Sequence, residues 1–77
     1  MSCTGTQAVL GQSYVSDAFT ASSSSLVVKV GGNPVAADVF GFGPYTVKVY
    51  ALDIRCPGPI EVFDGTRVAY CAKITGC

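Results

Sequence analysis

The stretch IEVFDGTRVAY, residues 60–70, has the pattern of a β-hairpin. Its two runs, 60–63 and 66–70, are rich in valine and aromatic residues, and they flank the dipeptide Asp64-Gly65. Because both central residues of a type I′ turn have positive φ, an Asp-Gly pair between such runs is the strongest short-range signal for a hairpin. The sequence therefore predicts two antiparallel strands that meet at this turn.

The same alternation of apolar and polar residues recurs upstream of the hairpin. Residues 26–30 predict a strand that stops at a dense turn signal, 31–34, and residues 45–52 predict the longest strand. Successive side chains of a strand point to opposite faces, so one face of the longest strand is expected to be buried. The side chains predicted to lie on that face are Tyr45, Val47, Val49 and Ala51.

The remaining segments give weaker signals. Residues 6–10 and 13–19 predict a first pair of strands split by a Gly-Gln dipeptide, whereas residues 35–40 suit a helical turn, a short strand or a loop. Short strands separated by Gly- and Pro-rich turns favour an all-β sandwich of about six short antiparallel strands. Tyr45 and Tyr70 are predicted to be core residues, and Tyr14 and Tyr50 are predicted to face the surface.

The four cysteines, Cys3, Cys56, Cys71 and Cys77, bracket nearly the whole chain. An even cysteine count in so short a chain indicates the disulfide framework of a secreted protein, with a cytosolic chain bearing free thiols as the alternative. Four cysteines allow three pairings, and the sequence does not choose among them. The wide spacing and the absence of histidine argue against a zinc site. We therefore expect one secreted, disulfide-stapled domain, residues 1–77, without a metal.

Composition and charge exclude several classes of function. Five acidic and five basic residues cancel and are scattered singly, so no basic stripe is available for nucleic acid. No run of 18 apolar residues could span a membrane. No signal peptide is visible, so we expect that a secretion signal has been cleaved and that Met1 is an added start.

Catalytic residues are also missing from the sequence. A serine or cysteine nucleophile needs a neighbouring base, usually histidine, and the chain contains neither histidine nor a G-x-S-x-G motif. The carboxylates Asp53, Glu61 and Asp64 lie close in sequence, but they fall at turns and on a strand face, where solvated groups are usual. We predict that the protein is not an enzyme and needs no cofactor.

Four residues are candidates for binding a partner protein. Phe42 lies in the loop Gly41-Phe42-Gly43-Pro44, close to Phe40, and an exposed aromatic pair would suit partner binding. Arg55 precedes a proline-rich loop that a disulfide would hold in shape. Three basic side chains in mid-strand, Lys29, Lys48 and Arg67, are expected to protect sheet edges. Lys29 and Arg67 would also give selectivity in strand addition.

The assembled pattern resembles the ToxB-like, or MAX-type, fungal effectors, mainly in cysteine placement and in the C-terminal half. The residues that carry the resemblance are Cys3, Tyr45-Thr46-Val47-Lys48, Cys56, Ile60-Glu61-Val62-Phe63, Gly65, Val68 and the final Cys77. The resemblance implies a sandwich of two three-stranded sheets, with Cys3 joined to Cys56, which would leave Cys71 to pair with Cys77. Members of this family act by binding host proteins and share no catalytic residues.

These observations lead to one preferred function and two alternatives. The preferred hypothesis is a secreted fungal effector that binds a host plant protein through a surface or an edge strand, as a monomer or with weak self-association. The first alternative is a small inhibitor of an amylase or a protease, in which Arg55 would enter a trypsin-like pocket. The second is a self-assembling structural or capsid component, which high apolar content and zero net charge would favour.

Overall fold

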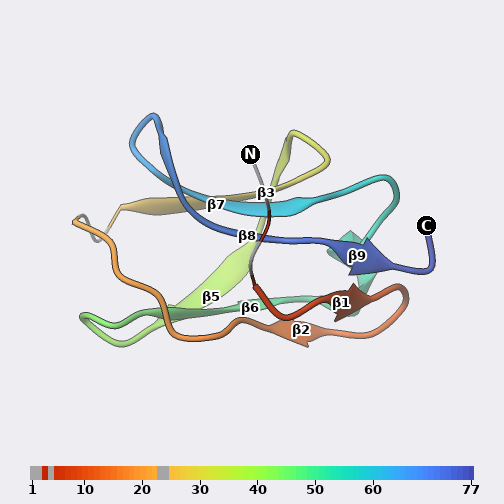
Figure 1. Cartoon of the computed structure of the whole chain (residues 1–77), viewed down its shortest axis with the longest axis horizontal. Coiled ribbons are helices and arrows are strands. Elements are labelled where there is room, and N and C mark those ends of the chain that lie inside the picture. The colour runs from red at the N-terminus through yellow and green to blue at the C-terminus, as the bar shows by residue number, and fades with distance from the viewer. Residues whose placement is uncertain (1–2, 4, 23–24) are drawn as a thin grey trace.

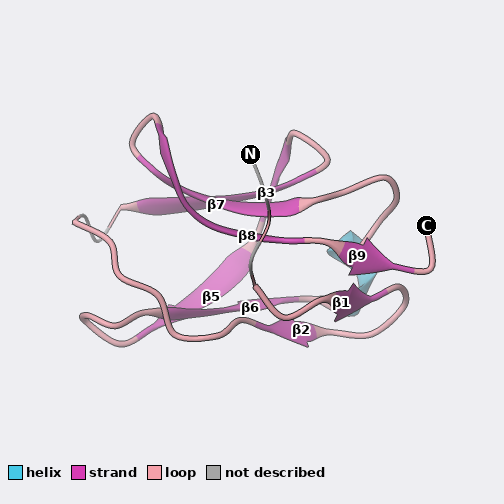
Figure 2. Ribbon diagram, viewed as in Figure 1, coloured by secondary structure: helices cyan, strands magenta, loops and turns pink. Residues whose placement is uncertain are grey.

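Two layers of β-strands make up this molecule, whose computed structural model describes residues 3, 5–22 and 25–77 (Figure 1). The helical structure within these residues is limited to one turn of 3-10 helix (Figure 2). The predicted small all-β sandwich is therefore confirmed, with more strands than expected because several are only two or three residues long. The elements are β1 (Ala8–Val9), β2 (Tyr14–Val15), β3 (Leu26–Val30), β4 (Asn33–Val35), β5 (Ala37–Phe40), β6 (Thr46–Val49), η1 (Ala51–Asp53), β7 (Ile60–Asp64), β8 (Arg67–Ala72) and β9 (Ile74–Thr75).

The first layer is an antiparallel sheet with the strand order β4-β3-β7-β8. The predicted hairpin joins β7 to β8, but Asp64 pairs with Arg67, so the turn consists of Gly65 and Thr66. Gly65 has a φ of 68°, and no non-glycine residue in the described chain has a positive φ. A turn with positive φ only at its first central residue is of type II′. The predicted type I′ turn at Asp64-Gly65 was therefore wrong, both in its type and in its position, which is one residue later.

The turn between β3 and β4 is also shorter than the sequence suggests. Gly31 and Gly32 have φ values of 60° and 84°, and Val30 pairs directly with Asn33 across them. The two glycines therefore form the whole turn, and the residues that follow begin β4. Pro34 lacks a backbone N–H, and a strand accepts such a residue at the edge of a sheet, which is where β4 lies.

The second layer is an antiparallel sheet with the strand order β2-β6-β5, and β1 pairs with β9 in a separate parallel pair. The predicted pairing of residues 6–10 with 13–19 is therefore wrong. Each segment contributes only two residues to a sheet and pairs with a strand from the C-terminal half of the chain. The turn between them is a corner, at which the amide of Gln12 donates a hydrogen bond of 3.1 Å to the carbonyl of Val9.

The ambiguous segment 35–40 is extended and links the two layers. β4 lies at the edge of the first sheet, β5 lies at the edge of the second, and one residue, Ala36, separates them. Figure 1 shows β5 as a broad ribbon beneath β3, continuous with the chain that comes from the first layer. One stretch of chain thus forms an edge of both sheets on the same side of the sandwich.

The core lies between the two layers and receives side chains from both. The predicted buried face of the longest strand is confirmed at Tyr45, Val47 and Val49, whereas Ala51 begins η1 and is only partly buried. Tyr14, predicted to face the surface, is only 5% exposed. Tyrosine can be buried when its hydroxyl has partners, as it does here. The buried apolar residues that form the core cluster are Ala8, Tyr14, Phe19, Val28, Val30, Tyr45, Val47, Val49, Ile54, Ile60, Val62, Ala72 and Ile74.

All four cysteines form disulfides, as predicted, but the bonds join Cys3 to Cys71 and Cys56 to Cys77. The pairing that the family resemblance implied is therefore wrong. Gly5 lies beside β8, where its amide donates a hydrogen bond of 3.0 Å to the carbonyl of Cys71. This contact places Cys3 beside Cys71. Cys77 instead bonds to Cys56, which lies in the loop that follows η1.

Candidate protein-binding surface

The four residues predicted to bind a partner lie in different parts of the molecule. Lys29 is on β3, an interior strand, where its Nζ lies 4.8 Å from the ring centroid of Phe63. Arg67 is the first residue of β8, an edge strand, beside the hairpin turn. Phe42 is in the β5–β6 loop, and Arg55 follows η1. The structure therefore does not bring these residues together into one site.

Of the three basic residues predicted to protect the sheet edges, only Arg67 lies on an edge strand. Lys29 on β3 and Lys48 on β6 both lie on interior strands, so neither can shield an edge. Pro34 protects the edge of β4, and Gly5 hydrogen-bonds to the edge of β8.

Phe42 is held away from the core, with 99% of its surface exposed. The preceding Gly41 has a φ of 86°, and a Cβ at that position would lie 2.5 Å from the carbonyl oxygen of Pro44. Only glycine fits at this position, because any side chain would collide with that oxygen and the positive φ disfavours other residues. The loop therefore presents Phe42 to solvent as a projecting side chain.

The strand before this loop also exposes apolar groups. Val39 is 40% exposed and Phe40 is 52% exposed. β5 pairs with β6 on one side, and no described strand pairs with its other side. Its outer backbone N–H and C=O groups are therefore available for hydrogen bonds to a further strand.

Polar groups accompany Phe40 on the outer face of the second sheet. The hydroxyl of Tyr50 donates a hydrogen bond to Oδ2 of Asp38, and the Nζ of Lys48 lies 5.8 Å from the ring centroid of Tyr50. The hydrogen bond to the carboxylate raises the pKa of the Tyr50 phenol. Asp38 and Lys48 are directly opposite each other in the register of β5 and β6. We call Asp38, Val39, Phe40, Phe42 and Tyr50 the β5 surface.

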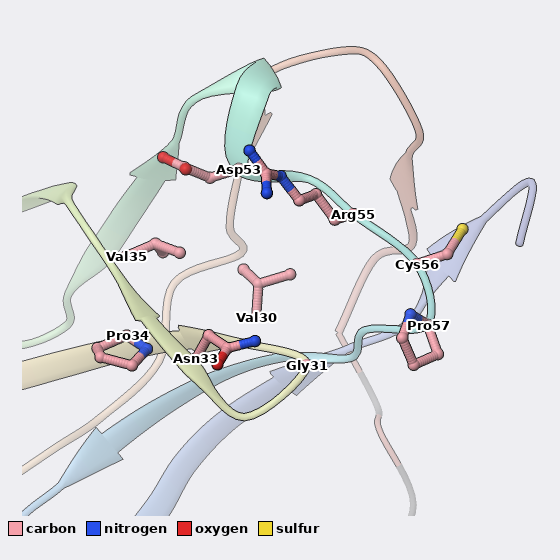
Figure 3. A pocket seen from close by; sticks show the side chains of 9 residues that line it. All are labelled: Val30, Gly31, Asn33, Pro34, Val35, Asp53, Arg55, Cys56 and Pro57. Atoms are coloured by element: carbon pink, nitrogen blue, oxygen red, sulfur yellow. The ribbon is translucent and has the colours of Figure 1, made fainter.

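A hollow of about 450 Å³ lies beside Arg55, as shown in Figure 3. The β3–β4 hairpin forms one wall, with the side chain of Val30 directed into the hollow, and Asp53 and Arg55 lie on the other. The Nε of Arg55 donates a hydrogen bond of 3.0 Å to the carbonyl of Leu52. Arg55 is exposed, and this hydrogen bond ties its side chain to a carbonyl of the preceding 3-10 turn.

A second group of titratable residues joins the two sheets at the side opposite to β5. The hydroxyl of Tyr14 donates to the carbonyl of Thr6 at 2.6 Å and lies 2.5 Å from the hydroxyl of Tyr70. The amide and the Oγ1 of Thr6 both donate to Asp17 at 2.8 Å. Hydrogen bonds from Thr6 lower the pKa of Asp17, and burial together with the bond to Tyr70 raises the pKa of Tyr14. The phenol of Tyr14 therefore stays neutral and serves as a structural donor.

Neither the family models, the curated proteins nor the solved structures that were compared with this chain gave a match. Within the described residues, no three His, Cys, Asp or Glu side chains gather closely enough to hold a metal ion. No helix in the same residues has the length and apolar character needed to cross a membrane.

The sequence indicated Phe42 and Phe40 as an exposed aromatic pair and Tyr50 as a surface residue, and it gave no sign of Asp38 or Val39. Phe42 was identified because glycines on both sides of an aromatic residue indicate a loop. Val39 gave no such signal, because it lies in the segment 35–40, whose pattern does not separate a helical turn from a short strand or loop. The contact between Asp38 and Tyr50 gave no signal, because the two residues are 12 positions apart and meet only through the pairing of β5 with β6.

Proposed function

We propose that this protein is an extracellular, non-catalytic domain that binds a partner protein through the β5 surface. One observation carries the proposal: an unpaired edge strand with exposed Val39 and Phe40 leads directly into a loop that projects Phe42. Aromatic residues dominate the binding energy of many protein interfaces, and an unpaired strand can accept a strand of the partner. The Tyr50 hydroxyl and the Asp38 carboxylate add polar groups beside this apolar centre.

The disulfides support an extracellular location. Two bonds in so short a chain are typical of secreted domains, which use cross-links because their cores are small. The resemblance to ToxB-like effectors supports a more specific version of the proposal, in which the chain is a fungal effector and the partner is a plant protein. That version depends on the sequence pattern of the C-terminal half, since the disulfide pairing differs from the one that the resemblance implies.

Site-specific photo-crosslinking tests the proposal. A photoreactive phenylalanine analogue placed at Phe42 is expected to capture a discrete protein from plant extracellular fluid. The same analogue at Val27 is the matched control, because Val27 is 46% exposed on β3, in the other sheet. A Phe42→Ser variant, added in excess as an unlabelled competitor, should block the capture much less than the unmodified protein does.

Two results would contradict the proposal. Identical crosslinks from the Phe42 and Val27 positions would show that capture does not depend on the β5 surface. Turnover of a sugar or a nucleic acid by the purified protein at ordinary enzyme rates would show that the protein is a catalyst.

A further inference from the structure

We infer that in the free protein a second copy of this chain covers the β5 edge, by antiparallel pairing of the two β5 strands about Val39. The inference adds a regulatory element to the β5 surface, because a partner would have to displace the second copy. This regulatory meaning rests on the proposed function, whereas the pairing itself rests only on the geometry of the edge.

The register of β5 limits how two copies can pair. Ala37 and Val39 lie opposite Val49 and Val47 on β6, whose side chains are fully buried, so they face the inner side of the sheet. Asp38 and the residue two positions on, Phe40, face the outer side. Directly opposite residues in an antiparallel pair share a face, so a two-fold pair of β5 strands must be centred on a residue rather than between two residues.

Charge selects the centre of this pairing. A pair centred on Asp38 would set the two Asp38 carboxylates directly opposite each other, and like charges in that position are destabilising. A pair centred on Val39 sets Asp38 opposite Phe40 of the second copy and the two Val39 side chains opposite each other. The two Phe40 rings then lie on one diagonal of roughly 7–8 Å, which aromatic side chains can span, and the two Asp38 carboxylates lie on the other diagonal, farther apart than when directly opposite. A centre at Phe40 would use Gly41, where the backbone leaves the strand.

The apolar groups and the overall charge both favour this occupant. Pairing removes Val39 and Phe40, which are 40% and 52% exposed, from water. Lys48 lies opposite each Asp38 within its own sheet, and the formal net charge of the chain is zero, so two copies approach without overall repulsion. The edges of β4 and β8 are less available, because of Pro34 and of the hydrogen bond from Gly5 to Cys71. β2 has only two residues to offer.

Sedimentation equilibrium from micromolar to millimolar concentration tests the pairing. For the unmodified protein, the mean mass is expected to rise with concentration from that of one chain toward twice that value. Val39→Lys places a charge at the centre of the pair and is expected to abolish the rise. Val27→Lys is the matched control, because Val27 has a similar exposure of 46% on an interior strand, and it should associate like the unmodified protein.

Amide chemical shifts measured on dilution of the unmodified protein give a second readout that does not depend on any variant folding. Changes with concentration are expected at residues 37–41 and not along β2, β4 or β8. A mean mass that stays at one chain throughout, association of Val39→Lys equal to that of the unmodified protein, or shift changes centred on another edge would each overturn the inference. A monomer that still gives the Phe42-specific crosslink would leave the proposed function standing without this pairing.

Discussion

The two sides of the sandwich differ in how their sheet edges are closed. On one side, β2 and β8 are joined by the contact between the hydroxyls of Tyr14 and Tyr70, and the N-terminal segment is tied to β8 by the Cys3–Cys71 disulfide. On the other side, the edges are β4 and β5, and no described strand covers β5. The closed side concentrates hydrogen bonds and a covalent cross-link, whereas the open side concentrates exposed apolar groups.

This difference indicates a division of roles within a small domain. A chain of 77 residues has little stability to spare, so its cross-links and satisfied polar groups matter to the free energy of unfolding. Exposed apolar side chains on an unpaired edge contribute little to that free energy and carry a risk of aggregation. We therefore expect substitutions on the closed side to change stability and substitutions on the open side to change binding.

The largest effect on stability is expected from removing the Cys3–Cys71 disulfide with a Cys3→Ser, Cys71→Ser double variant. The bond joins residues 68 positions apart, and the chain-entropy model gives a loss of about 4 kcal/mol. For the Cys56–Cys77 bond, with a separation of 21, the same model gives about 3 kcal/mol. Urea unfolding of both double variants measures the difference. A greater loss from the second bond would contradict the view that the N-terminal tie is the stronger one.

A smaller loss is expected from Tyr14→Phe. The substitution keeps the buried ring but removes the hydroxyl that donates to the carbonyl of Thr6 and contacts Tyr70. Loss of such a buried hydrogen bond should cost about 1–2 kcal/mol in the free energy of unfolding. Tyr50→Phe is the matched control on the open side, where Tyr50 is 42% exposed, and urea unfolding should show little change for it. Equal losses from the two variants would remove the distinction between the sides.

The pH dependence of stability is expected to reflect Asp17 on the closed side. Hydrogen bonds from Thr6 lower its pKa in the folded state, whereas an unfolded aspartate titrates near pH 3.9. The ionised carboxylate therefore stabilises the fold above that pH, and this contribution is lost as the pH falls through the lowered folded-state pKa.

Urea midpoints measured between about pH 5 and pH 2 should fall less steeply for Asp17→Asn than for the unmodified protein. Asp64→Asn should act in the same direction, because the hydroxyl and the amide of Ser22 both donate to Asp64 and lower its pKa. An unchanged slope for both variants would mean that these hydrogen bonds do not form in solution.

The smallest effect on stability is expected from Phe42→Ser. The side chain is 99% exposed, so its removal should change the free energy of unfolding by less than about 0.5 kcal/mol. Urea unfolding checks this expectation, and the crosslinking competition described above measures the accompanying loss of binding. A loss of stability as large as that of Tyr14→Phe would show that the loop packs against the domain in solution.

Local pattern determined the strands of the C-terminal half and part of the binding surface. The hairpin of β7 and β8, strand β3 and the buried face of Tyr45, Val47 and Val49 all follow from alternation and from nearby turn residues. These interactions are close in sequence, so short-range patterns report them well. Even there, the exact turn was missed by one residue, because Asp64 stays in the strand and only glycine adopts the positive φ.

Tertiary contacts decided the features that join distant parts of the chain. Neither the parallel pairing of β1 with β9 nor the choice of Cys71 as the partner of Cys3 leaves a mark in local sequence. The burial of Tyr14 depends on a hydroxyl of Tyr70, 56 positions away. The order of the strands in each sheet also decides which edge, here that of β5, remains unpaired among the described residues.

The sequence by itself determined an all-β, cross-linked chain with an exposed aromatic loop, because strand periodicity, cysteine content and glycine placement are local properties. The closed and open sides arose only in the folded structure, because they depend on which strands and cysteines meet across long loops.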